Sequence, residues 1–161
     1  MVRLLRGVDF DRYNRRMYIV GDADMLSLDQ IGVLESGRDV DSEEYVVCRV
    51  PRSREVGQSW LTTPLSVLSC LARVVQHMYR HSPDVVLCNG PGNCVLVCAV
   101  AFAPRIFGRK RIPIVYVESF ARVSSLSLSG KIAYLLADRF IVQWPGLQSK
   151  YPRAEHIPNI V

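Results

Sequence analysis

Short runs of aliphatic and β-branched residues alternate along this chain with segments of helical periodicity. The strand-like runs are residues 17–20, 45–50, 85–88, 112–117 and 140–142. The helical segments are residues 22–35, 64–80, 93–103 and 129–137. This alternation is typical of a parallel sheet whose strands are joined by crossover helices. Because residues 85–88 are apolar at every position, as in a strand covered on both sides, we expect an α/β fold with helices on both faces of the sheet.

The size and composition favour one folded domain. With 161 residues, of which 49% are hydrophobic and 22% charged, the chain is long enough for its own core and unlike a disordered polymer. Residues 94–104 form the longest apolar run, about half of the ~20 residues that a membrane-spanning helix needs. We therefore expect residues 1–161 to form a single domain, with a buried or interfacial helix in that run.

Basic residues outnumber acidic ones by 20 to 15 and gather in two clusters. The first cluster is Arg49, Arg52 and Arg54, and the second is Arg105, Arg109, Lys110 and Arg111. Clustered cations indicate an anionic partner such as a phosphate, a membrane surface or nucleic acid, although solvated surface explains them equally well.

The segment 64–80 shows the clearest helical period. Apolar residues recur every three or four positions at Leu65, Leu68, Ala72, Val75 and Tyr79. Polar residues fall on the opposite side at Ser66, Ser69, Arg73, Gln76 and Arg80, and His77 belongs with them. The pattern predicts that the apolar stripe faces the core and that His77 is solvated.

Five cysteines occur, at Cys48, Cys70, Cys88, Cys94 and Cys98. Most lie in apolar segments, which favours reduced core thiols in a cytosol-facing protein over a disulfide framework. Cys94 and Cys98 could share a helix face, but no second pair of Cys or His at ligand spacing completes a site with them. No metal and no cofactor is predicted.

The best candidate site is the turn Asn89-Gly90-Pro91-Gly92, which follows the strand-like run 85–88. Ligands of parallel sheets bind at the carboxyl ends of the strands. Two glycines allow backbone N–H groups to approach a ligand, and the N-terminus of the next helix favours an anion such as a diphosphate. A tight turn that needs glycine for geometry alone remains an equal alternative.

Glu118 and Ser119 close the next strand-like run and form a second candidate. A carboxylate after an apolar strand suggests hydroxyl binding or proton acceptance, so Glu118 is the candidate catalytic residue. A helix N-cap or an ion pair with Arg122 would explain it as well. Ser129-Gly130-Lys131 lacks the remaining features of a Walker motif, and no self-contained active site is recognisable.

Six phrases in a fixed order resemble one known family. They are residues 50–56, 58–60, 83–92, 114–119, 126–131 and 140–145. Together they resemble the Alg14-like family, the membrane-anchoring subunit of the UDP-N-acetylglucosamine transferase of asparagine-linked glycosylation. The resemblance spans nearly all of the chain, from residue 17 to the end.

The resemblance implies a Rossmann-like domain equivalent to the acceptor half of a GT-B glycosyltransferase. A separate catalytic subunit would supply the donor-binding half, and the complex would add the second N-acetylglucosamine to dolichyl-diphosphate-N-acetylglucosamine by inverting transfer. The family works at the cytosolic face of the endoplasmic reticulum membrane, without nucleic acid. Asn89, Gly90, Pro91, Gly92, Glu118 and Ser119 would line the acceptor side, and Arg105, Arg109, Lys110 and Arg111 would lie near the membrane.

The two ends of the chain carry further expectations. Family members usually begin with a membrane helix and a strand that ends in a Ser-Gly-Gly-His type loop. Residues 1–5 resemble the remnant of the helix after that loop, so we expect an N-terminally truncated form without the anchor. At the other end, Ile157, Ile160 and Val161 are apolar and would bind the catalytic partner, unless they fold back onto the domain's own core.

A different class of function is compatible with the same residues. The chain could be a soluble Rossmann-like module that binds a nucleotide or an RNA phosphate backbone, with the basic clusters as its footprint. Recovery of a donor-binding protein together with the chain would favour the transferase subunit, whereas recovery of nucleic acid would favour the module.

Overall fold

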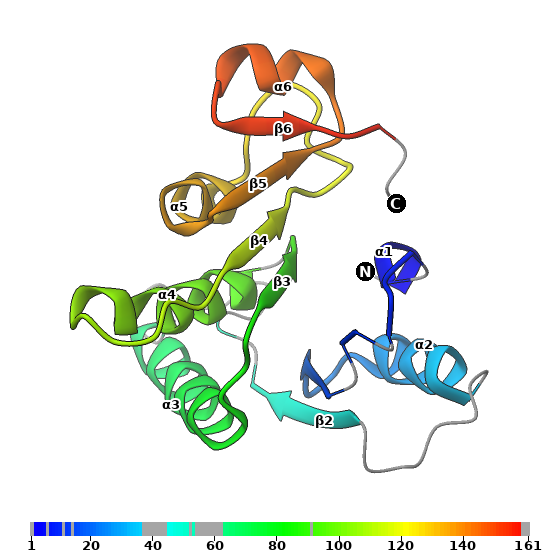
Figure 1. Ribbon diagram of the computed structural model, residues 1–161, viewed down its shortest axis with the longest axis vertical. Helices are drawn as coiled ribbons and strands as arrows, with labels where there is room; N and C mark the ends of the chain where they lie inside the picture. The colour runs from blue at the N-terminus through cyan, green and yellow to red at the C-terminus, as the bar shows by residue number, and fades with distance from the viewer. Residues whose placement is uncertain are drawn as a thin grey trace.

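The computed structural model describes residues 2–5, 7–10, 12–13, 15–36, 45–51, 53, 63–90 and 92–158. Helices and strands alternate along this part of the chain (Figure 1). In order they are α1 (Val2–Leu5), β1 (Arg16–Gly21), α2 (Met25–Ser36), β2 (Tyr45–Val50), α3 (Thr63–His81), β3 (Val86–Asn89), α4 (Gly92–Ile106), β4 (Ile114–Val117), α5 (Leu128–Leu136), β5 (Arg139–Val142), α6 (Pro145–Lys150) and β6 (Ala154–His156).

The strands form two parallel ladders. Strand β1 pairs with β2, and a second sheet has the order β3-β4-β5-β6. Parallel pairing requires a crossover between neighbouring strands, and the helices supply it. The predicted α/β fold with parallel strands flanked by helices is therefore confirmed. The sequence did not indicate that, within the described residues, the ladder is divided between β1–β2 and β3–β6.

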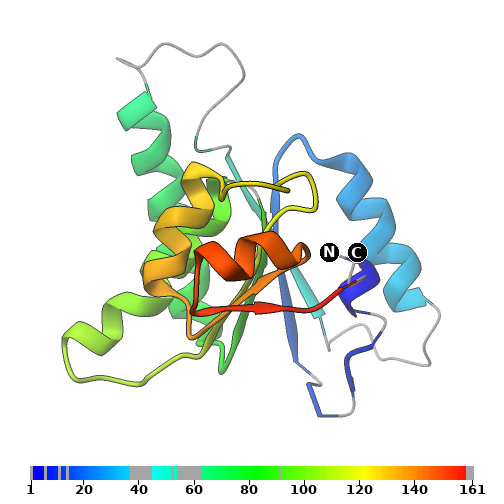
Figure 2. The ribbon, with the colours of Figure 1, turned by 90° about the horizontal axis from the view of Figure 1, so that it is seen from above.

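The main core lies between the β3–β6 sheet and a layer of three helices. Figure 2 shows α3, α4 and α5 on one side of the strands and α2 on the other. Helix α4 is the middle helix of the layer, and its buried residues are Val97, Cys98 and Ala101. Beneath it the largest buried side chains of the sheet are Ile114, Tyr116 and Phe140, with Tyr116 stacked on Phe140 at 5.2 Å between ring centroids.

Four of the five thiols belong to this core, and Cys48 lies outside it in β2. All five cysteines are free, and Cys48, Cys70, Cys88 and Cys98 are buried. The prediction of core thiols without a disulfide framework is confirmed. Among the described residues, no helix combines the length and the apolar character that a membrane span would require.

Helix α3 buries a different face from the one that its period predicted. The buried residues are Cys70, Val74 and Met78. Leu65 is 71% exposed, Leu68 is 60% exposed and Tyr79 is 85% exposed, so the prediction that this stripe faces the core is wrong. The helix carries apolar residues at helical spacing on two sides. Its contacts with α4 and β2 bury the side that contains Val74.

Helix α2 is capped at its start by Asp24. The Asp24 carboxylate accepts hydrogen bonds from the Ser27 N–H at 3.1 Å and from the Ser27 hydroxyl at 2.7 Å. These contacts satisfy a backbone donor that the first helical turn leaves without a partner. Near the other end of α2, Glu35 is buried and pairs with Arg16 of β1 at 2.9 Å, which ties the helix to the strand.

Candidate functional site

Three segments meet at the carboxyl ends of the strands. Asn93 in the first turn of α4 accepts a hydrogen bond from the Ser53 N–H at 2.8 Å and donates one to the Pro51 carbonyl at 3.3 Å. A β-carbon on Gly92 would lie 3.3 Å from the Ser53 hydroxyl and 4.0 Å from that of Ser129. The segment after β2, the start of α4 and the first turn of α5 therefore lie side by side.

The turn after β3 has the open geometry that a ligand would need. Gly90 has a φ of +83°, a conformation that side chains disfavour, and within the described part of the chain no non-neighbouring atom lies within 4 Å of the position of a β-carbon there. The Tyr116 hydroxyl of β4 donates to the Gly90 carbonyl at 3.0 Å and so holds the turn against the neighbouring strand. Helix α4 begins at Gly92, so its first backbone N–H groups lie beside the turn.

Both strand and helix hold this turn through weak thiol contacts. The Cys88 thiol donates to the Cys94 carbonyl at 3.8 Å, and the Cys94 thiol donates to the Asn89 carbonyl at 3.7 Å. Hydrogen bonding to the neighbouring thiols of Cys94 and Cys98, together with burial, raises the pKa of Cys88. These thiols support the turn from the core side.

Glu118 holds the next loop closed. The residue is 1% exposed, and its carboxylate accepts hydrogen bonds from the Ser119 N–H at 2.9 Å and the Ser127 N–H at 3.2 Å. The Ser127 hydroxyl lies 3.1 Å from both carboxylate oxygens. Ser127 is also the N-cap of α5 and accepts from the Gly130 N–H at 2.8 Å. Glu118 thus binds the cap of α5 and is not the cap itself, and its donors are Ser119 and Ser127 in place of Arg122.

Residues after β5 secure the same loop from the other side. Gln143 is buried and donates to the Glu118 carbonyl at 3.4 Å. Trp144 donates through Nε1 to the Phe120 carbonyl at 2.8 Å, and the two rings lie 5.0 Å apart. The loop that carries Ser119 is therefore fixed at one end by Gln143 and Trp144, which follow β5, and at the other end by Ser127, the N-cap of α5.

The structure brings most of the predicted site residues to one edge of the sheet. Asn89, Gly90, Gly92, Glu118 and Ser119 all lie there, and Pro91 lies outside the described residues. Sequence reasoning missed Ser53, Asn93, Tyr116 and Gln143. For Asn93 and Gln143 the only signal was a polar residue at the start of a helix or directly after a strand, which many surface positions share. Tyr116 lies within β4 and Ser53 lies beyond the end of β2, so no local signal marked them.

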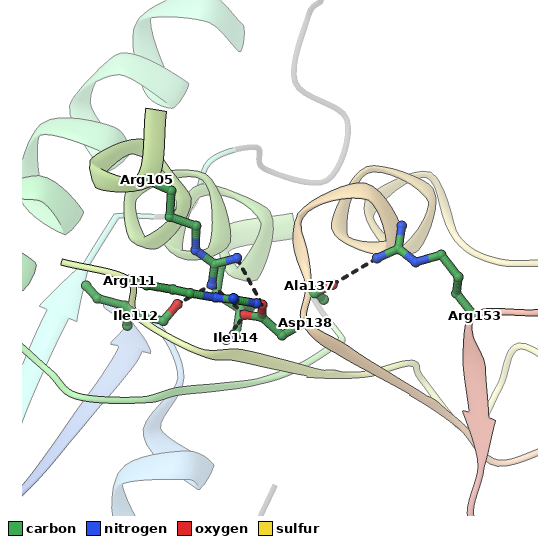
Figure 3. A network of polar contacts seen from close by, with 7 residues as sticks. All are labelled: Arg105, Arg111, Ile112, Ile114, Ala137, Asp138 and Arg153. Atoms are coloured by element: carbon green, nitrogen blue, oxygen red, sulfur yellow. Dashed lines mark hydrogen bonds and ion pairs between the residues drawn. The ribbon is translucent and has the colours of Figure 1, made fainter. Parts of the chain in front are cut away.

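The second basic cluster lies at the opposite edge. Arg105 binds both carboxylate oxygens of Asp138, and Arg111 donates to Oδ1 of Asp138 at 2.7 Å (Figure 3). The Ile114 N–H donates to Oδ2 at 2.8 Å. Partial burial alone would raise the pKa of Asp138, but these hydrogen bonds outweigh it and hold that pKa well below its usual range.

This network gives two residues of the basic cluster a structural role. Asp138 precedes β5 and Ile114 begins β4, so Arg105 and Arg111 join α4 to the amino ends of the strands. Lys110 pairs with Asp84 at the surface, where both side chains are largely exposed. Because the strands are parallel, the cluster and the turn Asn89-Gly90 lie at opposite ends of the sheet.

The C-terminal segment lies along the sheet. The Ile157 N–H donates to the Val142 carbonyl at 3.0 Å, while the Ile157 side chain is 36% exposed. Ile160 and Val161 lie outside the described residues, as do Arg52 and Arg54 of the first basic cluster.

Comparison with known proteins identifies the relatives of the chain. A family model described as "Oligosaccharide biosynthesis protein Alg14 like" matches residues 1–160. The UDP-N-acetylglucosamine transferase subunit alg14 of Schizosaccharomyces pombe is 44% identical over 160 residues, which cover 98% of this chain and 75% of the relative. The human subunit ALG14 is 43% identical over 166 residues, covering 100% of this chain and 76% of the relative. The rat subunit is 45% identical over 154 residues, covering 92% and 71%.

Proposed function

Since the chain belongs to the family of Alg14-like oligosaccharide biosynthesis proteins, we propose that it is the non-catalytic subunit of a heteromeric UDP-N-acetylglucosamine transferase. The complex adds the second N-acetylglucosamine to dolichyl-diphosphate-N-acetylglucosamine. In this role the chain binds the lipid-linked acceptor and recruits a separate catalytic subunit to the cytosolic face of the endoplasmic reticulum membrane. The relatives are named as subunits of a UDP-N-acetylglucosamine transferase. The assignment of acceptor binding to this chain and of donor binding to the partner is our proposal.

The observation that carries the acceptor role is the open turn at Gly90. Its φ of +83° favours glycine, and among the described residues no side chain packs against the position of a β-carbon there. The start of α4 lies next to the turn, and the partial positive charge of a helix N-terminus attracts anions. A diphosphate bound there would place its sugar near Ser119, across the edge of the sheet. Asn89, Gly90, Pro91, Gly92, Glu118 and Ser119 form this acceptor side.

In this proposal the two substrates of the transfer reaction bind to different chains. The acceptor hydroxyl gives up its proton to a general base and attacks the anomeric carbon of UDP-N-acetylglucosamine, and UDP leaves from the opposite face, so the configuration inverts. The partner holds the donor. Proton acceptance by Glu118 stays a prediction, and its surroundings favour another role. Its carboxylate is already engaged by Ser119 and Ser127, so it would orient Ser119 and the start of α5 toward the acceptor.

Membrane and partner contacts would use other surfaces. Arg109 and Lys110 remain candidates for contact with anionic headgroups, and the exposed side chains of Ile106 and Phe107 lie beside them in sequence. Arg105 and Arg111 would contribute their charge while bound to Asp138. A membrane plane that touches both this cluster and the acceptor turn would have to run along the strands. Ile157, Ile160 and Val161 are the proposed contacts with the catalytic subunit.

The test compares two glycines with the same backbone requirement. Gly90 and Gly108 both have positive φ, at +83° and +63°, and neither has an atom within 4 Å of a β-carbon position. Gly108 lies in the basic segment at the other edge. Gly90→Val and Gly108→Val should therefore strain the backbone to a similar degree. Gly92→Val is the second variant in the turn.

Each variant is co-expressed with the catalytic subunit, and transfer from UDP-N-acetylglucosamine to dolichyl-diphosphate-N-acetylglucosamine is measured beside the melting temperature. We expect Gly90→Val and Gly92→Val to lose transfer well beyond Gly108→Val at matched melting temperature. Losses of transfer in Gly90→Val and Gly92→Val that only match their losses of melting temperature would show that the turn is structural only. Recovery of nucleic acid in place of a donor-binding protein would favour the phosphate-binding module instead.

A further inference from the structure

One cysteine and two histidines lie close together where α3 contacts β2. The Sγ of Cys48 and one ring nitrogen each of His77 and His81 all lie within 4.8 Å of one another. Cys48 is 2% exposed, His77 is half-buried and His81 is exposed. None of these residues belongs to the candidate acceptor site. The sequence placed His77 on the solvated side of its helix, and the structure corrects this placement.

The fold explains why these side chains meet. His77 and His81 are four residues apart in the last turns of α3, so they project from one face of the helix. That face continues the buried row formed by Cys70, Val74 and Met78. Strand β2 contacts α3, and Cys48 lies in its middle, in register with Ile19 of β1. The pairing is therefore built by a helix and a strand and does not depend on a loop.

We propose that Cys48, His77 and His81 form a binding site for a zinc ion. Imidazole nitrogen and thiolate sulfur are the ligands that zinc prefers, whereas calcium and magnesium require oxygen. Zinc bonds of about 2.0–2.3 Å at tetrahedral angles separate neighbouring ligand atoms by about 3.3–3.8 Å. Zinc binding would therefore draw together ligand atoms that now lie within 4.8 Å of one another. Three protein ligands leave a fourth position for water, on the side where His81 reaches solvent.

Zinc binding has a defined chemical and structural effect. The ion replaces the Cys48 thiol proton, which is released to solvent, and both histidines bind as neutral imidazoles. It would join β2 to the end of α3, next to the start of β3. The β1–β2 ladder and the β3–β6 sheet are hydrogen-bonded separately within the described residues. A metal at this point would hold the first ladder against the helix layer of the second sheet.

The experiment uses the full 161-residue chain in reducing buffer. Zinc affinity is measured by competition with a chromogenic chelator, and cobalt is added as a spectroscopic substitute. We expect one equivalent of zinc, a thiolate-to-cobalt charge-transfer band and tetrahedral ligand-field bands. Because His81 is exposed, His81→Gln should fold normally. Changes around metal ligands typically cost 10–100-fold in affinity, so loss of this ligand should weaken zinc binding at least about tenfold.

Further variants separate this site from other thiols and imidazoles. Cys48→Ser should abolish the charge-transfer band, whereas Cys70→Ser and His156→Gln should leave both band and affinity unchanged. Zinc should raise the melting temperature of the wild-type chain and not that of His81→Gln, because a ligand that binds only the folded state stabilises it. No binding, binding that survives both Cys48→Ser and His81→Gln, or cobalt bound without the thiolate band would each overturn the proposal.

Discussion

The carboxylate of Glu118 occupies the volume that a side chain on Gly130 would need. A β-carbon at Gly130 would lie 1.7 Å from Oε2 and 2.9 Å from Cδ of Glu118. The same glycine donates its backbone N–H to the Ser127 hydroxyl, which in turn contacts Glu118. The first turn of α5 therefore packs directly on the end of β4, and only glycine allows that approach.

Gly130→Ala should destabilise the domain. The new methyl group would displace the buried carboxylate from its donors Ser119 and Ser127, and overpacking of this kind lowers the free energy of unfolding by about 1–3 kcal/mol. Gly146→Ala in α6 is the matched control, because no atom lies within 4 Å of its β-carbon position. Denaturant titration of both variants measures the difference. Equal stability of the two would show that Glu118 moves aside without cost.

Asp138→Asn should lower stability in a pH-dependent way. At pH 7 the loss of the charged acceptor of Arg105 and Arg111 should cost about 1.5–3 kcal/mol. The folded-state pKa of Asp138 lies below its unfolded value, which is about 3.9 for an aspartate in an unfolded chain. The contribution is therefore fully present above that value and is lost as the pH falls through it toward the folded pKa.

Urea titrations of wild type and Asp138→Asn at pH values from 7 to 3 measure this. The gap between the two should stay constant down to about pH 5 and shrink below about pH 4. Asp84→Asn, which removes the exposed partner of Lys110, should change little at any pH because surface ion pairs contribute little. A gap for Asp138→Asn that persists unchanged at pH 3 would contradict this account.

The two apolar sides of α3 should respond differently to truncation. Met78 is 5% exposed and packs in the core, so Met78→Ala should cost about 2–5 kcal/mol of unfolding free energy. Leu68 is 60% exposed, so Leu68→Ala should stay within about 0.5 kcal/mol of wild type. Thermal or chemical denaturation of the isolated chain compares them. A larger loss of unfolding free energy in Leu68→Ala than in Met78→Ala would show that the face predicted from the helical period packs on the core.

Removing Arg109 and Lys110 should weaken membrane binding without disturbing the fold. Each basic residue near an anionic bilayer contributes about 1 kcal/mol, or about fivefold in affinity. The double variant Arg109→Ser/Lys110→Ser leaves Arg105 and Arg111 on Asp138. Liposome flotation with anionic vesicles measures the loss, and Arg73→Ser/Arg122→Ser removes the same charge elsewhere. Equal flotation of the two double variants would show that the proposed cluster has no special role.

Deleting residues 159–161 should weaken capture of the catalytic subunit. The backbone of Ile157 is already tied to Val142, so the deletion should leave the melting temperature of the isolated chain nearly unchanged. Pull-down of the partner at matched expression provides the measurement. Full recovery of the partner with the shortened chain would place the interface elsewhere, and a lowered melting temperature would show that the tail packs on this domain.

The elements of this fold follow from local sequence. The all-apolar run before Asn89 and the glycines after it predict a strand, a turn and a helix start, and β3 and α4 lie there. Likewise α2 lies within the predicted helical segment 22–35, with Asp24 as its cap. The reason is that strand and helix formation, capping and tight turns depend on residues within a few positions of one another. The order of elements from β1 to β5, the parallel pairing and the edge that carries the candidate site were therefore predictable, whereas α6 and β6 were not predicted.

Only the tertiary structure decided which long-range partners these elements meet. Ser53 and Asn93 are 40 positions apart, and Arg105 and Asp138 are 33 apart. Cys48 and His77 come from different elements in the same way. On α3 the period allowed two apolar faces, and packing against α4 and β2 selected the one with Val74. A local pattern fixes which residues share a face, whereas the topology of the whole chain fixes what that face touches.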